Sequence, residues 1–434
     1  MSSPELGPYA ALQHPNFRRY IVGLFAFTMA VQIQGTIVGW QIYELTHDKL
    51  ALGLIGLAEA LPFIGFALYA GHVADRHDRR RVALAALTVL VFCSVALLVL
   101  PLALAKAPGR VTPLIYAVIV ISGVARSFLQ PARQALGQEL VPRALFHNAV
   151  TWRSGAWQLA SVLGPAIGGI LYAVGGTTVA YAGDALLVMV GLLAIASVRH
   201  RSIIDREHTN EVAESLKEGI RFVFREPILL GALSLDLFSV FFGGATALLP
   251  VFAAEILRVG PQGLGLLRAA PAIGAVVTSF VIVHCPPMEH AGRTLFLAVA
   301  AFGLFTIGFG LSTSFWLSVA MLVLGGAADM VSVSIRSNLL QTLTPQHLFG
   351  RVSAVNNVFV GSSNEIGMFE SGVTAKLFGT VPSVVLGGLA TLVVVAVTFG
   401  RNKPLRTLRR IHEMGESSRG LLRRDAPAAA TDGR

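Results

Sequence analysis

Long apolar runs recur along the whole of this 434-residue chain. Each spans about 20 residues, the length that an α-helix needs to cross the hydrocarbon core of a bilayer. The chain is 54% hydrophobic and 13% charged, and this charged share is about half that of an average soluble domain. The sequence therefore predicts an all-α polytopic membrane protein.

Twelve such runs can be counted, and a charged connector separates the first six from the last six. The predicted transmembrane helices are residues 18–41, 50–73, 80–104, 112–135, 149–174, 178–198, 227–254, 262–284, 293–312, 314–340, 352–378 and 381–400. The chain then divides into an N-terminal segment (1–17), a first six-helix bundle (18–198), the connector (199–226), a second six-helix bundle (227–400) and a basic tail (401–434). A surface helix is expected in the connector from Ser215 to Phe224, and the composition of the tail predicts disorder.

Lys and Arg residues at the ends of these runs are unevenly distributed, with 24 on one side of the predicted membrane and 5 on the other. The side rich in Lys and Arg is usually cytoplasmic. Both termini and the connector are therefore expected in the cytoplasm, which an even number of crossings allows.

The net charge of +10 does not indicate a nucleic-acid partner, because membrane topology accounts for basic residues at helix ends. The two cysteines, Cys93 and Cys285, provide no disulfide framework. The sequence contains no P-loop, no zinc-ligand spacing and no G-x-S-x-G pattern. We expect a protein that is not an enzyme and that binds no metal or cofactor.

An internal repeat relates the two halves. Residues Gly123–Phe146 align without gaps with Gly326–Phe349 at an offset of 203, and nine of the 24 positions are identical. The identities include Arg133 with Arg336. Two unrelated apolar helices often share Leu or Ala by chance, but they rarely share Arg. The repeat predicts two pseudo-symmetric bundles with a substrate cavity between them, near the membrane midplane.

A dense charge cluster, GHVADRHDRRR, joins the second and third predicted helices. Its pattern G-x-x-x-D-R-x-x-R-R matches at Gly71, Asp75, Arg76, Arg79 and Arg80. This loop resembles the signature loop of the major facilitator superfamily, although Asp78 stands where that family usually has glycine. The resemblance implies that Asp75 caps the start of the eleventh helix, around residues 350–355, and so locks the halves together in the outward-facing state. A membrane-topology anchor is the simpler alternative for the arginines.

The fifth predicted helix carries a glycine-rich pattern, G-x8-G-P-x-x-G-G. It matches at Gly155, Gly164, Pro165, Gly168 and Gly169. The small residues allow close helix contact and the proline loosens the helix, so packing alone could also explain them. The pattern resembles the motif of drug–proton antiporters, and features across residues 15–400 resemble the branch that holds enterobactin exporters and macrolide efflux proteins. A bacterial cytoplasmic membrane and a monomeric state are expected from this resemblance.

Ionisable residues inside predicted helices are costly and indicate functional sites. The candidates for proton coupling are Glu59, Asp236, Arg126, Asp329 and Glu365. The repeat aligns Arg126 with Asp329, and an offset of 209 aligns Glu59 with Arg268, so opposite charges are expected to pair across the cavity. Structural ion pairs are the alternative for any one of them.

Polar and aromatic residues in the same helices are candidates for lining a substrate cavity. They are Gln34, Gln41, Trp40, Asn357 and Arg268. Amides near aromatic rings suit a large, partly polar ligand, and hydrogen bonding between helices is the alternative role.

These features predict a secondary transporter that exports amphipathic small molecules, drug-like or siderophore-like, in exchange for protons by alternating access. The expected partners are the small-molecule substrate, protons and the lipid bilayer. An uptake symporter, a lipid flippase of the same fold and a membrane sensor without transport are the alternatives.

Overall fold

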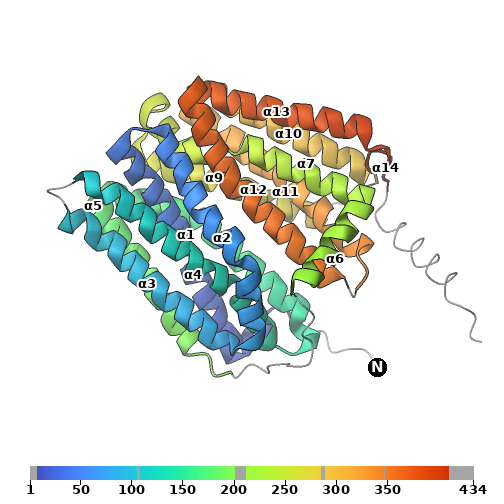
Figure 1. The fold of residues 1–434 in the computed structure, drawn as a ribbon, viewed down its shortest axis with the longest axis horizontal. Helices are drawn as coiled ribbons and strands as arrows, with labels where there is room; N and C mark the ends of the chain where they lie inside the picture. Colours follow the sequence, from blue (N-terminus) through green and yellow to red (C-terminus); the bar gives the residue numbers. More distant parts are fainter. Residues whose placement is uncertain (1–6, 105–107, 201–211, 285–288, 347, 410–434) are drawn as a thin grey trace, which may run out of the picture.

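The computed structural model describes residues 7–104, 108–200, 212–284, 289–346 and 348–409, and the ordered elements there are helical (Figure 1). The long helices are α1 (Pro15–Thr46), α2 (Lys49–Arg76), α3 (Arg79–Ala103), α4 (Val111–Glu139), α5 (Phe146–Ala196), α7 (Pro227–Gly243), α9 (Gly260–His284), α10 (Ala291–Leu311), α11 (Phe315–Leu343), α12 (Phe349–Phe378) and α13 (Thr380–Arg401). Figure 1 shows α1 to α5 gathered on one side and the later helices on the other. The two groups meet mainly along α2 with α12 and along α5 with α9.

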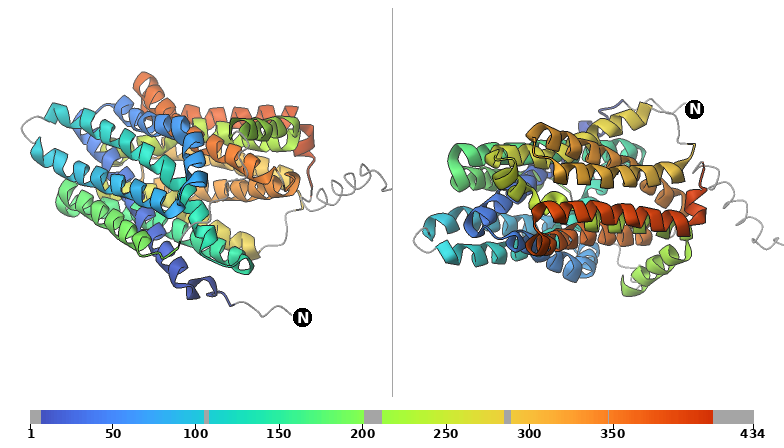
Figure 2. Two further views of the ribbon diagram at one scale, coloured as in Figure 1. Left: turned by 60° about the horizontal axis from the view of Figure 1, so that its bottom comes forward. Right: turned by 90° about the horizontal axis from the view of Figure 1, so that it is seen from above.

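The helices run roughly along the long axis of the molecule, as two further views show (Figure 2). Ten stretches among the described residues are long and apolar enough to cross a membrane. One of them, α5, contains two arms, because Gly175 and Gly176 leave the helical conformation and Gly183 then lies against Leu171. These arms match the predicted helices 149–174 and 178–198.

Helix α12 is absent from those ten stretches although it is 30 residues long. Asn, Ser and Glu residues along its length lower its hydropathy. The prediction of twelve crossings with cytoplasmic termini therefore stays a prediction.

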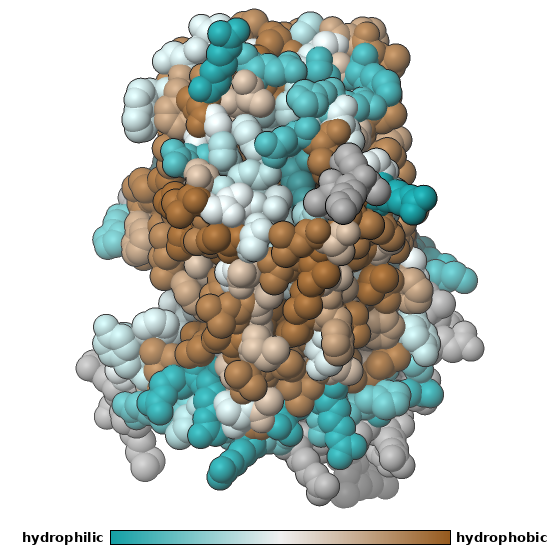
Figure 3. Space-filling view, turned by 90° about the vertical axis from the view of Figure 1, so that its left-hand side faces the viewer, coloured by the Kyte–Doolittle hydropathy of each residue, from teal (hydrophilic) through white to brown (hydrophobic). Residues whose placement is uncertain are grey.

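The surface suits an apolar solvent. Large side chains such as Phe92, Leu297 and Trp316 are about 70% exposed. On the face drawn in Figure 3, hydrophobic residues spread across the middle and hydrophilic ones gather towards the upper and lower ends. Exposed apolar side chains of this size suit the hydrocarbon core of a bilayer.

The starts of two helices agree with the internal repeat. Helix α5 begins at Phe146 and α12 begins at Phe349, which are separated by the same 203 residues as the aligned segments. Equivalent segments of the two halves therefore have equivalent secondary structure.

The predicted helix 227–254 is not continuous. Helix α7 ends at Gly243, and the chain continues through Ala245–Leu248, the short α8 (Leu249–Val251) and a π-helical turn, Phe252–Ile256. The Ser371 hydroxyl of α12 donates a hydrogen bond to the carbonyl oxygen of Gly244 at 3.1 Å. A neighbouring helix thus satisfies a backbone group that the break frees, as the low-dielectric interior requires.

The connector and the tail are more ordered than expected in two places. The predicted surface helix is confirmed and extends over α6 (Val212–Arg225). Residues 401–409 of the tail fold back onto the second group, where Leu405 is fully buried and Asn402 donates a hydrogen bond to the Pro227 carbonyl at 2.7 Å. The prediction of disorder was wrong for 401–409, and residues 410–434 lie outside the described part, as do Cys285 and residues 201–211.

Candidate functional site

A cavity of about 560 Å³ lies between the two groups of helices, lined by α2, α4, α11 and α12. Its size is within the range that holds small molecules. Its walls combine charged, amide and aromatic side chains, among them Glu59, Arg126, Arg336, Glu365, Asn357 and Phe63. The wall reaches Gln341 and Phe349, on either side of the turn between α11 and α12, so the cavity extends towards that end of the molecule.

An ion pair from the first group stands in the wall of this cavity. Arg126 of α4 donates a hydrogen bond from Nη2 to Oε1 of Glu59 in α2 at 2.7 Å. Glu365 of α12 is an electrostatic neighbour of both residues. Its Oε2 atom is buried and has no hydrogen-bond partner among the described residues. Two carboxylates from opposite groups therefore lie next to one arginine.

A second ion pair lies within the later helices. Arg336 of α11 pairs with Asp236 of α7, and both side chains are less than 10% exposed. Asp329 is an electrostatic neighbour of both. The expectation that Arg126 and Asp329 pair with each other across the cavity was therefore wrong, because Arg126 pairs with Glu59 and Asp329 lies beside Asp236 and Arg336 within the later helices.

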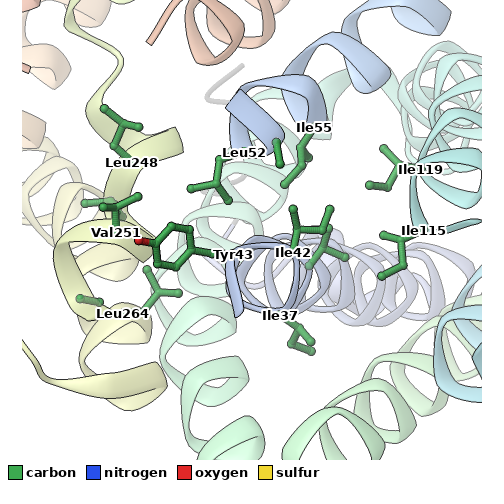
Figure 4. Packing of buried hydrophobic residues seen from close by; sticks show 14 of the residues in the cluster. Ile37, Ile42, Tyr43, Leu52, Ile55, Ile115, Ile119, Leu248, Val251 and Leu264 are labelled. Atoms are coloured by element: carbon green, nitrogen blue, oxygen red, sulfur yellow. The ribbon is translucent and has the colours of Figure 1, made fainter. Parts of the chain in front are cut away.

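At the other end of the molecule the two groups close on each other. The Tyr43 hydroxyl of α1 donates a hydrogen bond to Glu255, and Lys376 of α12 pairs with Asp48 at 3.1 Å. Figure 4 shows the Tyr43 ring pointing towards Leu248, Val251 and Leu264 of the second group. These residues belong to one buried apolar cluster shared by both groups. We refer to these contacts together as the closed end.

Glycines allow the backbones to meet at the closed end. A Cβ added at Gly169 of α5 would lie 2.4 Å from the Pro261 carbonyl oxygen, and one at Gly53 of α2 would lie 2.9 Å from Gly372. Gly164 and Gly168 of the same motif pack against α1, at Gln32 and Ile33. By contrast, a Cβ at Gly155 would meet nothing within 4 Å.

A comparison with protein families identifies the family of this chain. The model of the family described as transmembrane secretion effector matches residues 6–417. The chain belongs to this family of major facilitator superfamily transporters.

The curated relatives are similar over most of their length. The chain is 27% identical over 388 residues to the enterobactin exporter EntS of Shigella flexneri, covering 88% of this chain and 90% of the relative. It is also 27% identical over 389 residues to EntS of Escherichia coli O139:H28, with the same shares covered.

Solved structures share the fold at low identity. A POT family transporter in complex with 5-aminolevulinic acid matches with a TM-score of 0.71 and 12% identity, over 93% of this chain and 98% of that one. A D-xylose-proton symporter matches with a TM-score of 0.65 and 14% identity, over 89% and 97%. As a transmembrane secretion effector family member, the protein is a multi-pass transporter of the cytoplasmic membrane rather than an enzyme.

The charged loop of this family member has two parts with different surroundings. Asp75 is exposed and no hydrogen bond or ion pair involves it in the described part of the chain. Arg79 pairs with Glu139, and Arg80 donates a hydrogen bond to the Ala196 carbonyl at 2.6 Å. Asp78 caps α3 by accepting a hydrogen bond from the Arg81 N–H at 3.0 Å, which explains how the turn forms without glycine. The role of Asp75 as a lock stays a prediction.

The predicted cavity residues are divided by the structure. Asn357 lines the cavity, and Gln34 lines a small crevice beside Glu59. Arg268 donates a hydrogen bond to the Gly35 carbonyl at 2.8 Å, between α9 and α1. Gln41 is buried and accepts a hydrogen bond from Tyr181 at 2.6 Å, and Trp40 packs edge-on against Tyr172. The structure places these last two in helix packing outside the cavity.

Two arginines were not predicted as site residues. They are Arg336, in the cavity wall, and Arg133, in an adjoining recess. The internal repeat could have pointed to them, because it aligns Arg133 with Arg336 at the offset of 203. A charge kept at the same position of two apolar helices is costly and therefore indicates a role.

Proposed function

We propose that this transmembrane secretion effector is a proton-driven exporter of amphipathic small molecules, in a conformation open to the cytoplasm. The architecture we propose has twelve crossings in two six-helix bundles, with both termini cytoplasmic. The turn between α11 and α12, where the cavity ends, then lies on the cytoplasmic side, because the positive-inside rule places it there. The closed end is periplasmic.

The observation that carries this proposal is that the cavity extends to one end of the molecule while the two groups of helices are closed at the other end. A molecule from the cytoplasm can enter between the two groups of helices, at the end where α11 turns into α12, whereas Tyr43 with Glu255 and Asp48 with Lys376 close the opposite exit. Rocking of one bundle against the other would open the closed end and seal the cavity from the cytoplasm. Asp75, which is exposed in the present conformation, would then reach the start of α12.

Glu59 and Glu365 are the proposed proton-coupling pair. They come from different bundles and lie next to Arg126. Because two carboxylates this close disfavour a doubly charged state, one proton is held while they are together. In the present conformation, substrate that enters the cavity beside Glu59 and Glu365 would displace this proton into the cytoplasm, and the pair would take up a new proton from the periplasm once the closed end has opened. Asp236 is assigned to a structural pair with Arg336 instead.

Export, rather than uptake, is supported by the relatives named enterobactin exporter and by the position of Gly169 at the bundle interface. Drug-like and siderophore-like molecules fit a cavity of about 560 Å³ with amide, charged and aromatic walls. The direction can be tested with respiring everted vesicles, whose outer face is cytoplasmic. We expect them to accumulate one or more compounds from a panel of fluorescent drugs and siderophores, and a protonophore to abolish the accumulation. Accumulation only in right-side-out vesicles would contradict export.

A further inference from the structure

The residue Arg133 lies in a recess that adjoins the main cavity. The recess has a volume of about 220 Å³ and is lined by α1, α4 and α5, with Gln32, Gln130 and Trp157 among its walls. Arg126 and Gln130 border both spaces, so the recess is a side pocket of the cavity.

The internal repeat shows how this arginine differs from its counterpart. Arg336 occupies the equivalent position in the second half, and Asp236 of α7 neutralises it. In the first half, the helix α1 instead presents Phe27, whose ring centroid lies 5.5 Å from the Arg133 guanidinium carbon. An aromatic ring therefore stands beside Arg133 where the second half has a carboxylate.

A second cation increases the local excess of positive charge. Arg153 of α5 is an electrostatic neighbour of Arg133, and no ion pair involves either residue within the described part of the chain. Glu59 pairs with Arg126 and Glu139 pairs with Arg79, and among the described residues the electrostatic neighbours of Arg133 are Tyr20 and Arg153 rather than a carboxylate. Two partly buried guanidinium groups without an acidic partner retain a desolvation cost that an anion would offset.

We propose that this recess binds the anionic group of the transported molecule, and that the cavity therefore selects amphipathic organic anions with an aromatic part. The Arg133 guanidinium donates to the carboxylate or a comparable anion, and its planar fork suits such a group. Gln32 and Gln130 supply amides at the rim, and the exposed ring of Trp157 provides a stacking face. This inference rests on the proposed function only in taking the cavity as the substrate site.

The test compares two probes of the same shape, 2-naphthoate and the uncharged 2-naphthamide. Equilibrium binding is measured on the full chain in nanodiscs at neutral pH, with empty nanodiscs subtracted. We expect the wild type to prefer the anion. Arg133→Gln should weaken naphthoate binding by about tenfold or more and leave naphthamide binding unchanged, because it removes a charge-assisted hydrogen bond. Arg133→Lys should retain part of the preference.

Two further variants make the result specific. Phe27→Asp introduces a carboxylate beside Arg133, as Asp236 stands beside Arg336, and should remove the preference for naphthoate while Arg133 remains. Arg110→Gln removes an exposed arginine far from the recess and should change nothing. Equal binding of both probes to the wild type, or equal loss of both in Arg133→Gln, would overturn the proposal. Because binding needs no proton gradient and no direction of transport, a failure of the export proposal would not produce either result.

Discussion

Glu59 of α2 and Arg126 of α4 form an ion pair with their nearest atoms 2.7 Å apart, and Glu365 of α12 stands beside it from the other bundle. This relationship joins the two halves electrostatically at the inner end of the cavity. Protonation of one carboxylate therefore changes the free energy of bringing α2 and α12 together. The pairing gives the proposed coupling a specific physical basis.

Gly169 should be required for the closed end, whereas Gly155 should not. A Cβ at Gly169 would lie 2.4 Å from the backbone oxygen of Pro261, so Gly169→Ala forces α5 and α9 apart. We expect the substitution to raise the free energy of the conformation with the closed end formed by about 1–3 kcal/mol, as at other overpacked sites. Gly155→Ala is the matched control from the same motif, because its Cβ has open space. Transport assays should show impaired export for Gly169→Ala alone, and equal activity of both variants would contradict the interface role.

Asp236 should act mainly on stability. Asp236→Asn leaves the buried Arg336 without its partner, and we expect a loss of about 3 kcal/mol, with Asp329 nearby limiting the damage. Thermal unfolding of the purified protein measures this loss. The double variant Asp236→Asn with Arg336→Met should recover most of it. Unchanged stability of Asp236→Asn together with lost proton coupling would instead return Asp236 to the role of proton carrier.

Asp75 should affect the rate of transport but not the stability of the present conformation, in which it is exposed. Asp75→Asn removes the charge that the lock at the start of α12 requires. Asp78→Asn removes the same charge three residues away and keeps the cap on α3, because Asn caps helices as well as Asp. Initial rates of export should fall for Asp75→Asn only. Equal rates in the two variants would show that the loop is a topology anchor.

The pair of Asp48 and Lys376 should hold the closed end over the physiological pH range. Burial raises the pKa of Asp48, but the Leu50 N–H and the Lys376 ammonium outweigh it and lower the pKa below its usual value. A carboxyl with a lowered pKa stabilises this conformation above about pH 4 and loses the effect only as pH falls through the lowered pKa. Both side chains are more than 40% exposed, so Asp48→Asn should cost at most about 1 kcal/mol.

The measurement is the ratio of export rates of Asp48→Asn and wild type against periplasmic pH. The ratio should be constant between about pH 5 and pH 8. A ratio that changes steeply in this interval would mean that the pair titrates there and that the pKa of Asp48 is not lowered.

The sequence predicted the helices and the repeat because both depend on local composition. The start of α12 at Phe349 follows from the start of α5 at Phe146 and the offset of 203. The break after Gly243 was missed because its stability depends on the contact of Ser371 with Gly244, which is distant in sequence. The ordered segment around Leu405 was missed for the same reason, since its burial is supplied by α7 and α10.

The sequence singled out some of the residues that line the cavity, but not how they pair. Glu59, Arg126 and Glu365 were identified from the cost of charge in an apolar helix. Alignment of the two halves shows which positions are equivalent, but not which face of each helix meets which neighbour. Arg126 was therefore paired with Asp329 in the prediction, and it pairs with Glu59 in the structure.

The central claim is that Glu365 couples protons to export. We would measure proton release from acid-loaded everted vesicles with a pH-sensitive dye, using a compound that such vesicles accumulate, for wild type and Glu365→Gln. We predict that the compound triggers proton release in the wild type, and that Glu365→Gln abolishes the release while still exchanging labelled for unlabelled compound. Proton release at the wild-type rate in Glu365→Gln would contradict the claim.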